Sequence, residues 1–545
     1  MAFIKKEKKA SGTYLRVVHG YRDTDGKIKH KTLINLGKAE DYSKQSLQNM
    51  GKLLYELGDG DIEELENLST KELGRYYYGF ALVVRRLLEE YGLDNFFDRI
   101  GRNKDLNYSL TQSVLLMVSE RLHDPVSKRA SYENQTEYLG IEHLELQYIY
   151  RSLDHLCANQ EIIQRMIFEK GRNLFNQSLD VVFYDVTTFY FESNNEDGFR
   201  ERGFNKDGKI GTTTVMFGML IDKNKNPVGY EVYHGKQYEG YTFSDVIEKL
   251  RRKYRIEKTI TVADRGMMNK DNIIDITSKT NYEYIIGERL KNLSNAAKDE
   301  ILDKTKYKKL QIVDQETMKK VTIEYYIHKY NGKSIITTYS ESRAKHDRYL
   351  REERVKKAKK LLENPSEIDK KARYHYIEKT GKNTYHLNEE KIKENEKYDG
   401  FLSIATNVSG LTTAQILDAY KDLYKIEHTF RSLKSFLETR PMFHWTKNRI
   451  MGHICLCYIT YTLLNCLQQK LKQAGKAMSE NMIRKNLISM QVSLIRNQGH
   501  EYYLRSSTKP GASDIMELLK IRELPNLVPR EVINNYLKCV DKSAM

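Results

Sequence analysis

One segment of this chain, VVFYDVTTFYF from Val181 to Phe191, strongly restricts what the chain can fold into. Ten of its eleven residues are apolar, aromatic or β-branched, which is typical of a strand covered on both faces. The remaining residue is Asp185, near the middle. A buried carboxylate without a partner costs several kcal/mol or more, so it is normally protonated, paired or bound to a metal. The segment therefore predicts an inner strand with a carboxylate that needs a partner.

The segments that follow alternate between strand and helix patterns. Two strands, TTTVMFGMLID and VGYEVYHG, flank a hairpin turn at Asn224–Pro227. A helix, FSDVIEKLRRKYR, precedes a short strand, TITVAD, which ends at Asp264, and a helix at about 269–278 precedes the strand YEYIIGERL. This order predicts an α/β chain with a ribonuclease H-like core, in which helices accompany a mixed five-stranded sheet.

The composition favours an acidic partner and a soluble protein. The 90 lysines and arginines exceed the 74 aspartates and glutamates, and the resulting charge of +16 attracts polyanions such as nucleic acids. The five cysteines lack zinc-ligand spacing, as expected for reduced thiols in a cytosolic protein. The most apolar stretch, Ile454–Leu467, is shorter than the roughly 20 residues of a membrane span. We therefore expect a buried helix, no membrane contact and a cytoplasmic location.

The patterns divide the chain into six expected regions. TYLRVVHGYRDTDGKIKHKTLINLG predicts a basic hairpin that turns at Asp25-Gly26, and a strand-rich insertion carries the basic helix RAKHDRYLREERVKKAKKLLE. The regions are a basic β-hairpin (1–40), a helical region expected to bind DNA (41–178), the first part of the catalytic core (179–291), the β-rich insertion (292–398), the second part of the core (399–474) and a C-terminal region that is a candidate for dimerisation (475–545).

Two further acids are expected near Asp185. In a ribonuclease H-like sheet the strands of Asp185 and Asp264 are parallel neighbours roughly 4.8 Å apart, so both carboxylates ionise easily only with a cation. The third acid, Glu427, belongs to a helical stripe with spacings of 3, 4, 3 and 4. The stripe consists of Tyr420, Leu423, Glu427, Phe430 and Lys434. We expect Glu427 to face inward with Leu423 and Phe430.

Each acid also has an explanation without chemistry. Asp185 could lie at an exposed edge, and Asp264 could merely end a strand before a turn. Glu427 could pair with Arg431 or Lys434 where the helix meets the sheet. Three converging acids without a His or Cys cluster instead suit hard divalent cations such as Mg²⁺. Two such ions, about 3.5–4 Å apart, support displacement at a phosphodiester.

At these residues the chain resembles bacterial insertion-sequence transposases of the DDE class, in the branch with a β-rich insertion before the catalytic Glu. The resemblance covers most of the chain. It includes YDVTTFYFES around Asp185, TVADRGM around Asp264 and YKDLYKIEHTFRSLKSFLETRPMFHW around Glu427, and it continues through TTYSESRAKHDRYLREERVKKA and YDGFLSIATN. It implies that these three acids are the catalytic residues and the ligands of two Mg²⁺ or Mn²⁺ ions.

The resemblance also implies DNA contacts. The signature of the branch is Tyr, two residues, Arg, three residues, Glu, six residues, Lys. The matching positions are Tyr420, Glu427 and Lys434, and Leu423 occupies the Arg position. The basic members of the motif bind DNA phosphates near the cleaved end, so Lys434 is expected to do so. Tyr420, the first position of the same motif, is also expected to contact DNA. Lys425 and Arg431 are the candidates to replace the missing Arg.

The implied reaction is cleavage of one strand at each transposon end, which frees a 3′-hydroxyl. That hydroxyl then attacks target DNA, or first the opposite strand to give a hairpin. The implied partners are double-stranded DNA, comprising terminal inverted repeats and target DNA, and a second copy in a homodimer at the bacterial nucleoid. The alternative is a catalytically inactive DNA-binding protein derived from such an enzyme. A ribonuclease H or a junction resolvase would leave the insertion and the Tyr420–Lys434 pattern unexplained.

Two other features have open interpretations. Nine basic residues on the insertion helix form either a solvated face or a phosphate contact. They are Arg343, Lys345, Arg348, Arg351, Arg354, Lys356, Lys357, Lys359 and Lys360. Trp445, the only tryptophan, is expected to pack after the catalytic helix rather than to stack on a displaced base. His428 and His453 have no neighbours in the sequence that would form a metal set.

Overall fold

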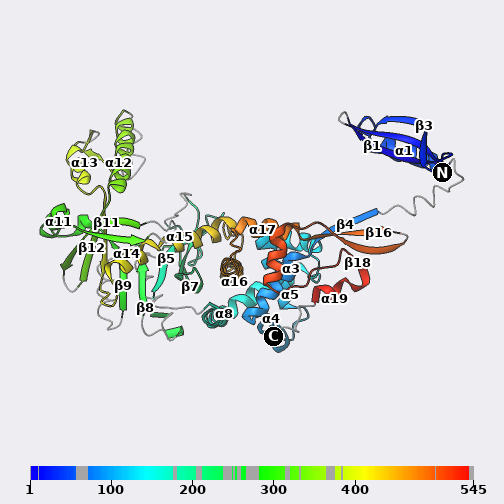
Figure 1. The fold of residues 1–545 in the computed structure, drawn as a ribbon. Helices are drawn as coiled ribbons and strands as arrows, with labels where there is room; N and C mark the ends of the chain where they lie inside the picture. Colours follow the sequence, from blue (N-terminus) through cyan, green and yellow to red (C-terminus); the bar gives the residue numbers. More distant parts are fainter. Residues whose placement is uncertain are drawn as a thin grey trace. The chain divides into compact units, whose positions relative to one another are not determined.

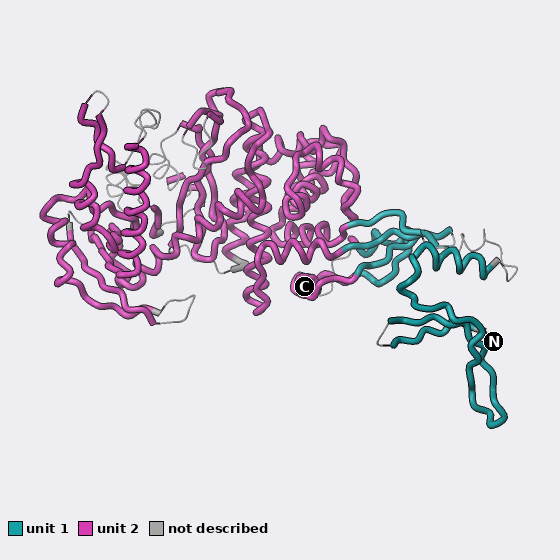
Figure 2. The backbone as a smooth tube through the Cα atoms, turned by 90° about the horizontal axis from the view of Figure 1, so that it is seen from above, with its two compact units in different colours: residues 1–76, 491–506, 524–536 teal, residues 77–490, 507–523, 537–545 magenta. Residues whose placement is uncertain are grey.

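The computed structural model of the chain describes residues 2–9, 12–56, 71–175, 181–203, 211–236, 248–249, 252–254, 259–264, 282–313, 320–330, 333–363, 375–381, 384–497 and 499–538. The chain forms two compact units, which are coloured separately in Figure 2. The first comprises Met1–Tyr76, Gln491–Ser506 and Leu524–Tyr536. The second comprises Tyr77–Met490, Ser507–Glu523 and Leu537–Met545.

The first unit contains two sheets. The N-terminal sheet has the order β1-β2-β3, and its strands are Ala2–Lys9, Gly12–Arg22 and Ile28–Lys38. The predicted hairpin is β2 with β3, and it turns where glycine was expected: Gly26 has a φ of 73° and donates its N–H to the Asp23 carbonyl at 2.9 Å. Strand β1 has no counterpart in the prediction. Helix α1 (Lys44–Glu56) follows, and the second sheet consists of β18 (Leu527–Pro529), β17 (His500–Arg505), β16 (Gln491–Asn497) and β4 (Lys71–Tyr77).

Among the described residues, the second unit is built on one mixed sheet of nine strands in the order β10-β11-β12-β15-β9-β8-β5-β6-β7 (Figure 1). β5 is parallel to β8, and β8 to β9, whereas the other neighbours are antiparallel. The strands are β5 (Val181–Tyr190), β6 (Thr214–Asp222), β7 (Pro227–His234), β8 (Thr259–Ala263), β9 (Tyr282–Glu288), β10 (Lys308–Val313), β11 (Lys320–Tyr330), β12 (Lys333–Tyr339) and β15 (Phe401–Thr406).

The sheet contains the five predicted core strands, β5 to β9, but the expectation that it stops at five strands is wrong. β15 pairs with β9, and β12 of the insertion pairs with β15, so the insertion strands extend the same sheet. The physical reason is that an uncovered edge strand presents unpaired backbone groups, which further strands can satisfy. The helix predicted around 243–255 is described only at 248–249 and 252–254, and the one predicted at 269–278 lies outside the described residues.

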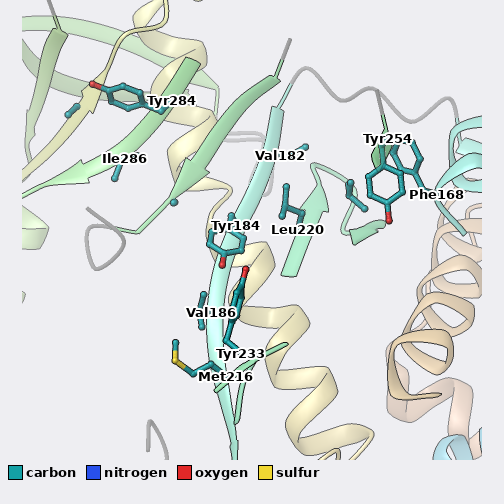
Figure 3. Close-up of a cluster of buried hydrophobic side chains, with 13 residues drawn as sticks. Phe168, Val182, Tyr184, Val186, Met216, Leu220, Tyr233, Tyr254, Tyr284 and Ile286 are labelled. Atoms are coloured by element: carbon teal, nitrogen blue, oxygen red, sulfur yellow. The ribbon is translucent and has the colours of Figure 1, made fainter. Parts of the chain in front are cut away.

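Alternate residues of β5 separate the two faces of the sheet. Val182, Tyr184 and Val186 belong to one buried cluster, together with Met216 of β6 (Figure 3). Because successive side chains of a strand point to opposite faces, Asp185 lies on the other face. Asp185 therefore shares its face with Phe183 and Thr187, which are both buried.

The helices that follow the sheet are α14 (Thr413–Lys421), α15 (Tyr424–Arg431), α16 (Lys447–Gln473), α17 (Glu480–Ser489), α18 (Pro510–Leu518) and α19 (Ile533–Lys538). Those that precede it are α3 (Gly79–Tyr91), α4 (Leu93–Asn103), α5 (Leu110–His123), α6 (Lys128–Asn134), α7 (Leu146–Ala158) and α8 (Gln160–Phe175). α16 packs against α3, α5, α7 and α8. By length and composition α16 could cross a membrane, but 94% of its apolar window is buried inside the protein, as expected of a core helix.

The insertion between β9 and β15 also carries helices. They are α11 (Asn295–Leu302), α12 (Glu341–Leu362) and α13 (Glu389–Glu396), and a small hairpin joins β13 (Ile377–Lys379) to β14 (Tyr385–Leu387). The predicted basic helix is α12. One of its nine basic residues differs from expectation, because Arg351 is buried and pairs with Asp399 and Glu396. Arg351 therefore anchors α12, while the other eight basic side chains are exposed.

Candidate active site

Asp185 and Asp264 occupy matching positions next to each other on parallel strands. Tyr184 of β5 pairs with Ala263 of β8. Asp185 is the residue after Tyr184, and Asp264 is the residue after Ala263, so the two aspartates follow this pair side by side. Neighbouring strands are about 4.8 Å apart. Asp185 is half-buried, and its Oδ1 accepts a hydrogen bond from the Val186 N–H at 2.7 Å, whereas Asp264 is exposed. The structure thus brings the two aspartates together, as the strand order predicts.

Helix α15 packs against β5 on the same face as Asp185. The ring of Phe430 on α15 meets the ring of Phe217 on β6 edge to face, with 6.2 Å between centroids. Phe217 pairs with Thr187 of β5, and Thr187 shares a face with Asp185 because the two are two residues apart. The helix that carries Glu427 therefore covers the side of the sheet on which the aspartates lie.

Glu427 does not face inward, so that expectation is wrong. Its side chain is exposed, although its predicted neighbours Leu423 and Phe430 are buried. The buried residues of α15 are Ile426, Thr429 and Phe430. Glu427 follows Ile426 by about 100° around the helix, which places it at the edge of the buried face. A carboxylate at that edge reaches solvent.

The acids satisfy the requirements of a divalent cation only in part. Carboxylate oxygens are the ligands that Mg²⁺ prefers, and two of the three acids are adjacent. Within the described ranges, however, no group of three or more His, Cys, Asp and Glu side chains is close enough to hold a metal ion. The structure therefore assembles the aspartate pair and leaves Glu427 outside it, on a helix that packs against the same face.

The remaining positions of the predicted DNA-binding motif have different surroundings. Leu423, at the motif's Arg position, is 8% exposed and belongs to the core. Lys425 donates to the Asp422 carboxylate at 2.7 Å, whereas Arg431 is exposed. The half-buried members are Tyr420 and Lys434. Of the two candidate replacements for the missing Arg, Arg431 is therefore the more accessible.

Two arginines hold the end of the helix that carries these residues. After α15 the chain continues as a π-helical segment, Ser432–Phe436, a form that is frequent at functional sites. Arg484 of α17 donates to the Phe436 carbonyl at 2.8 Å, and Arg121 of α5 donates to the next two carbonyls at 3.1 Å. Carbonyls at the end of a helix lack helical partners, so cationic donors stabilise them. These contacts fix the turn that follows Lys434.

Arg121 also borders a buried polar cluster. Burial lowers the pKa of Lys128 to about 7, and its Nζ has no hydrogen-bond partner in the described part of the chain. Burial likewise raises the pKa of Glu120 to about 7. Burial, followed by the nearby positive charges, lowers the pKa of His444 to about 3 and that of His453 well below its usual value. Both histidines are therefore neutral at physiological pH.

Two accessible aromatic side chains after the helix were missed by the sequence-based prediction. Trp445, expected to pack, is 62% exposed, and Phe443 is 64% exposed. The alternation in PMFHWTK is a period-2 signal that could have revealed them, since residues that alternate along an extended segment point to opposite sides. The roles of Arg121 and Arg484 had no such signal, because their carbonyl partners lie far away along the chain.

Two models of protein families match this chain. A model of the IS1634 family transposase N-terminal domain matches residues 3–68, and a model of the transposase DDE domain matches residues 176–463. No curated protein matches the chain.

Solved structures of transposases are similar at low identity. A piggyBac transposase synaptic complex with hairpin DNA covers 75% of this chain and 78% of that chain, with 8% identity and a TM-score of 0.38. A Mos1 transposase paired-end complex with the left transposon end covers 32% of this chain and 57% of that chain, with 9% identity and a TM-score of 0.15. The match to a Mos1 mariner paired-end complex with Mn covers 32% of this chain and 57% of that chain, with 11% identity and a TM-score of 0.14. The chain spans little more than half the length of these Mos1 chains.

Proposed function

This chain belongs to the family of transposases with a DDE domain, and we propose that Asp185, Asp264 and Glu427 are the carboxylates that catalyse its reaction. The matched domain, residues 176–463, covers more than half of the chain and contains all three acids. The protein is therefore an enzyme that cleaves DNA at transposon ends and transfers the freed strand to target DNA. The order β7-β6-β5-β8-β9 supports a ribonuclease H-like core.

One observation carries the assignment of the acids. In the register between β5 and β8, Asp185 lies beside Asp264. The edge-to-face contact between the rings of Phe430 and Phe217 holds the helix of Glu427 against the same face of the sheet. Three acids from separate elements thus belong to one side of one sheet. The exposure of Asp264 and Glu427 supports access by a DNA strand.

We propose that these carboxylates hold divalent cations, Mg²⁺ or Mn²⁺, with two ions per site. Their oxygens are the donors that such hard cations prefer. When bound, a pair of divalent cations supplies the charge that activates the attacking oxygen and stabilises the leaving oxygen in a displacement at phosphorus. The aspartate pair provides a rigid half of the site on the sheet, and Glu427 provides the half that approaches it from the helix.

The chain's own basic residues position the DNA backbone in this proposal. Lys434 and Tyr420 contact phosphates near the cleaved end, and Arg431 contributes the positive charge that Leu423 cannot. Arg121 and Arg484 hold the turn behind Lys434 through its carbonyls, so they position Lys434 without touching DNA. Two transposon ends must be held together for strand transfer, which favours a homodimer on DNA.

The experiment that tests this function compares strand cleavage by the wild type and by Asp185→Asn. The substrate is DNA with the ends of the element, supplied with Mg²⁺. The matched control is Asp299→Asn, which removes the same charge from an exposed position on α11. We expect cleavage by the wild type and the control and none by Asp185→Asn. Absence of cleavage in all three proteins would favour the alternative, a DNA-binding protein without activity.

A further inference from the structure

The segment Met442–Trp445 continues the sheet beyond the end of β5. The N–H of Met442 donates to the Tyr190 carbonyl at 3.1 Å, and Met442 forms a parallel bridge with Phe191. This extended pairing makes side chains alternate between the two sides. Met442 and His444 are 3% and 9% exposed, whereas Phe443 and Trp445 are 64% and 62% exposed. Two large aromatic side chains therefore project from the same edge into solvent.

Trp445 is held in place by a buried cation. The Arg200 guanidinium lies 5.3 Å from the indole centroid and 5.5 Å from the centroid of Phe191. Arg200 is 6% exposed, and its Nε donates to the Asp197 carboxylate at 2.8 Å, so its position is fixed. An aromatic ring braced by a cation in this way is attracted electrostatically and loses side-chain freedom before any ligand binds.

Two further cations follow this segment in the chain, and each lies against a different aromatic ring. Lys447 is exposed, and its Nζ lies 5.1 Å from the centroid of Phe199. The Arg449 guanidinium lies 5.0 Å from the centroid of Tyr150. Cations interleaved with accessible aromatic rings are the combination that binds single-stranded nucleic acids, because bases stack on the rings while phosphates meet the charges.

We propose that Phe443, Trp445 and Lys447, the aromatic-basic patch, bind unpaired nucleotides of the DNA substrate, while the buried Arg200 holds the indole of Trp445 in place. This inference rests on the proposed function, since it supposes a DNA strand in the acid site. From Asp185 to Phe191 the β-strand rises roughly 20 Å at about 3.3 Å per residue, so the patch lies about that far from the acids. The patch therefore meets the strand several nucleotides away from the cleaved bond. Its positive charge favours DNA over a second copy of this basic chain.

The intrinsic emission of Trp445 tests the proposal directly, because the chain contains a single tryptophan. The probe is an oligothymidylate of about 20 nucleotides, compared with a blunt duplex of equal length. We expect the oligothymidylate to quench the emission in a saturable manner and the duplex to quench it much less. Trp445→Ala should weaken oligothymidylate binding, measured by fluorescence anisotropy of a labelled strand, by about 5- to 150-fold, the range for one stacked base.

Two control variants separate stacking from folding. Trp445→Phe keeps an aromatic face and should bind within about twofold of the wild type, which shows that the ring rather than the tryptophan itself is needed. Met482→Ala changes an apolar side chain that is 51% exposed on α17 and should leave affinity unchanged. Equal affinity of Trp445→Ala and the wild type would overturn the proposal.

Other outcomes also decide the question. Equal quenching by the duplex would overturn the preference for unpaired nucleotides. Emission that depends on protein concentration but not on DNA would instead assign the patch to contact between copies of the chain. Asp185→Asn should retain the quenching, because the patch does not include the acids. Cleavage by Asp185→Asn together with normal quenching would refute the proposed function while leaving the patch in place.

Discussion

The buried ammonium of Lys128 makes a strong prediction about stability. Lys128 is 3% exposed, its Nζ has no hydrogen-bond partner in the described part of the chain, and burial lowers its pKa from the usual 10.5 to about 7. It is also the first residue of α6, where the helix dipole disfavours a cation. Below pH 7 the protein must hold this charge without a counter-charge, because Glu120, whose pKa is raised to about 7, is protonated there.

The magnitude follows from the two pKa values. The 3.5-unit difference between 10.5 and about 7, at about 1.36 kcal/mol per unit, is a penalty of roughly 5 kcal/mol below pH 7. Between pH 7 and 10.5 the unfolded chain binds more protons at Lys128 than the folded chain does. Stability therefore rises with pH across this window, and the penalty disappears above it. At about pH 9.5 roughly 1.4 kcal/mol remains.

Lys128→Met removes the charge and keeps a side chain of similar length. We expect the variant to have a higher free energy of unfolding than the wild type, by up to about 5 kcal/mol at about pH 6 and by about 1 kcal/mol at about pH 9.5. Urea unfolding followed by circular dichroism at both pH values measures the difference. Lys104→Met, at an exposed position, is the control and should change little. A variant that is less stable than the wild type at pH 6, or a gain that does not change with pH, would refute the reasoning.

Three further predictions concern the site and the insertion. Leu423→Arg introduces the Arg of the predicted motif but buries a guanidinium at a core position, so thermal unfolding should show a loss of several kcal/mol and cleavage should not improve. Asp399→Asn removes a partner of the buried Arg351 and should destabilise the insertion by about 3 kcal/mol in thermal unfolding, unlike Glu396→Gln, whose side chain is 56% exposed. Arg484→Lys should reduce strand cleavage, because an ammonium cannot reproduce the two directed bonds to backbone carbonyls.

The sheet was predictable because its strands have a strong local pattern. Two short apolar runs each contain one acid, Asp185 within the first and Asp264 at the end of the second. Because the strand order makes these two runs neighbours, it predicts that the acids meet. The register of Tyr184 with Ala263 bears this out. The turn at Asp25-Gly26 was predictable for a similar reason, since glycine accepts the positive φ that the turn needs.

The orientation of Glu427 could not be predicted in the same way. A stripe through Leu423 and Phe430 assumes one continuous helix, and the sequence contains no proline or glycine to mark the break between α14 and α15. The buried face includes Leu423, Ile426 and Phe430, and Glu427 lies at its edge. Likewise, only pairing between distant segments decides that the insertion strands join the sheet or that Arg351 is buried.

The proposed mechanism requires Asp185, Asp264 and Glu427 to share bound cations, and iron-directed cleavage of the polypeptide measures this. Fe²⁺ binds oxygen-rich sites in place of Mg²⁺, and with ascorbate and peroxide it produces hydroxyl radicals that cut the backbone close to the ion. We predict cuts near all three acids, suppressed by excess Mg²⁺ and lost in Asp185→Asn. Cuts near the two aspartates with none near Glu427 would contradict the account.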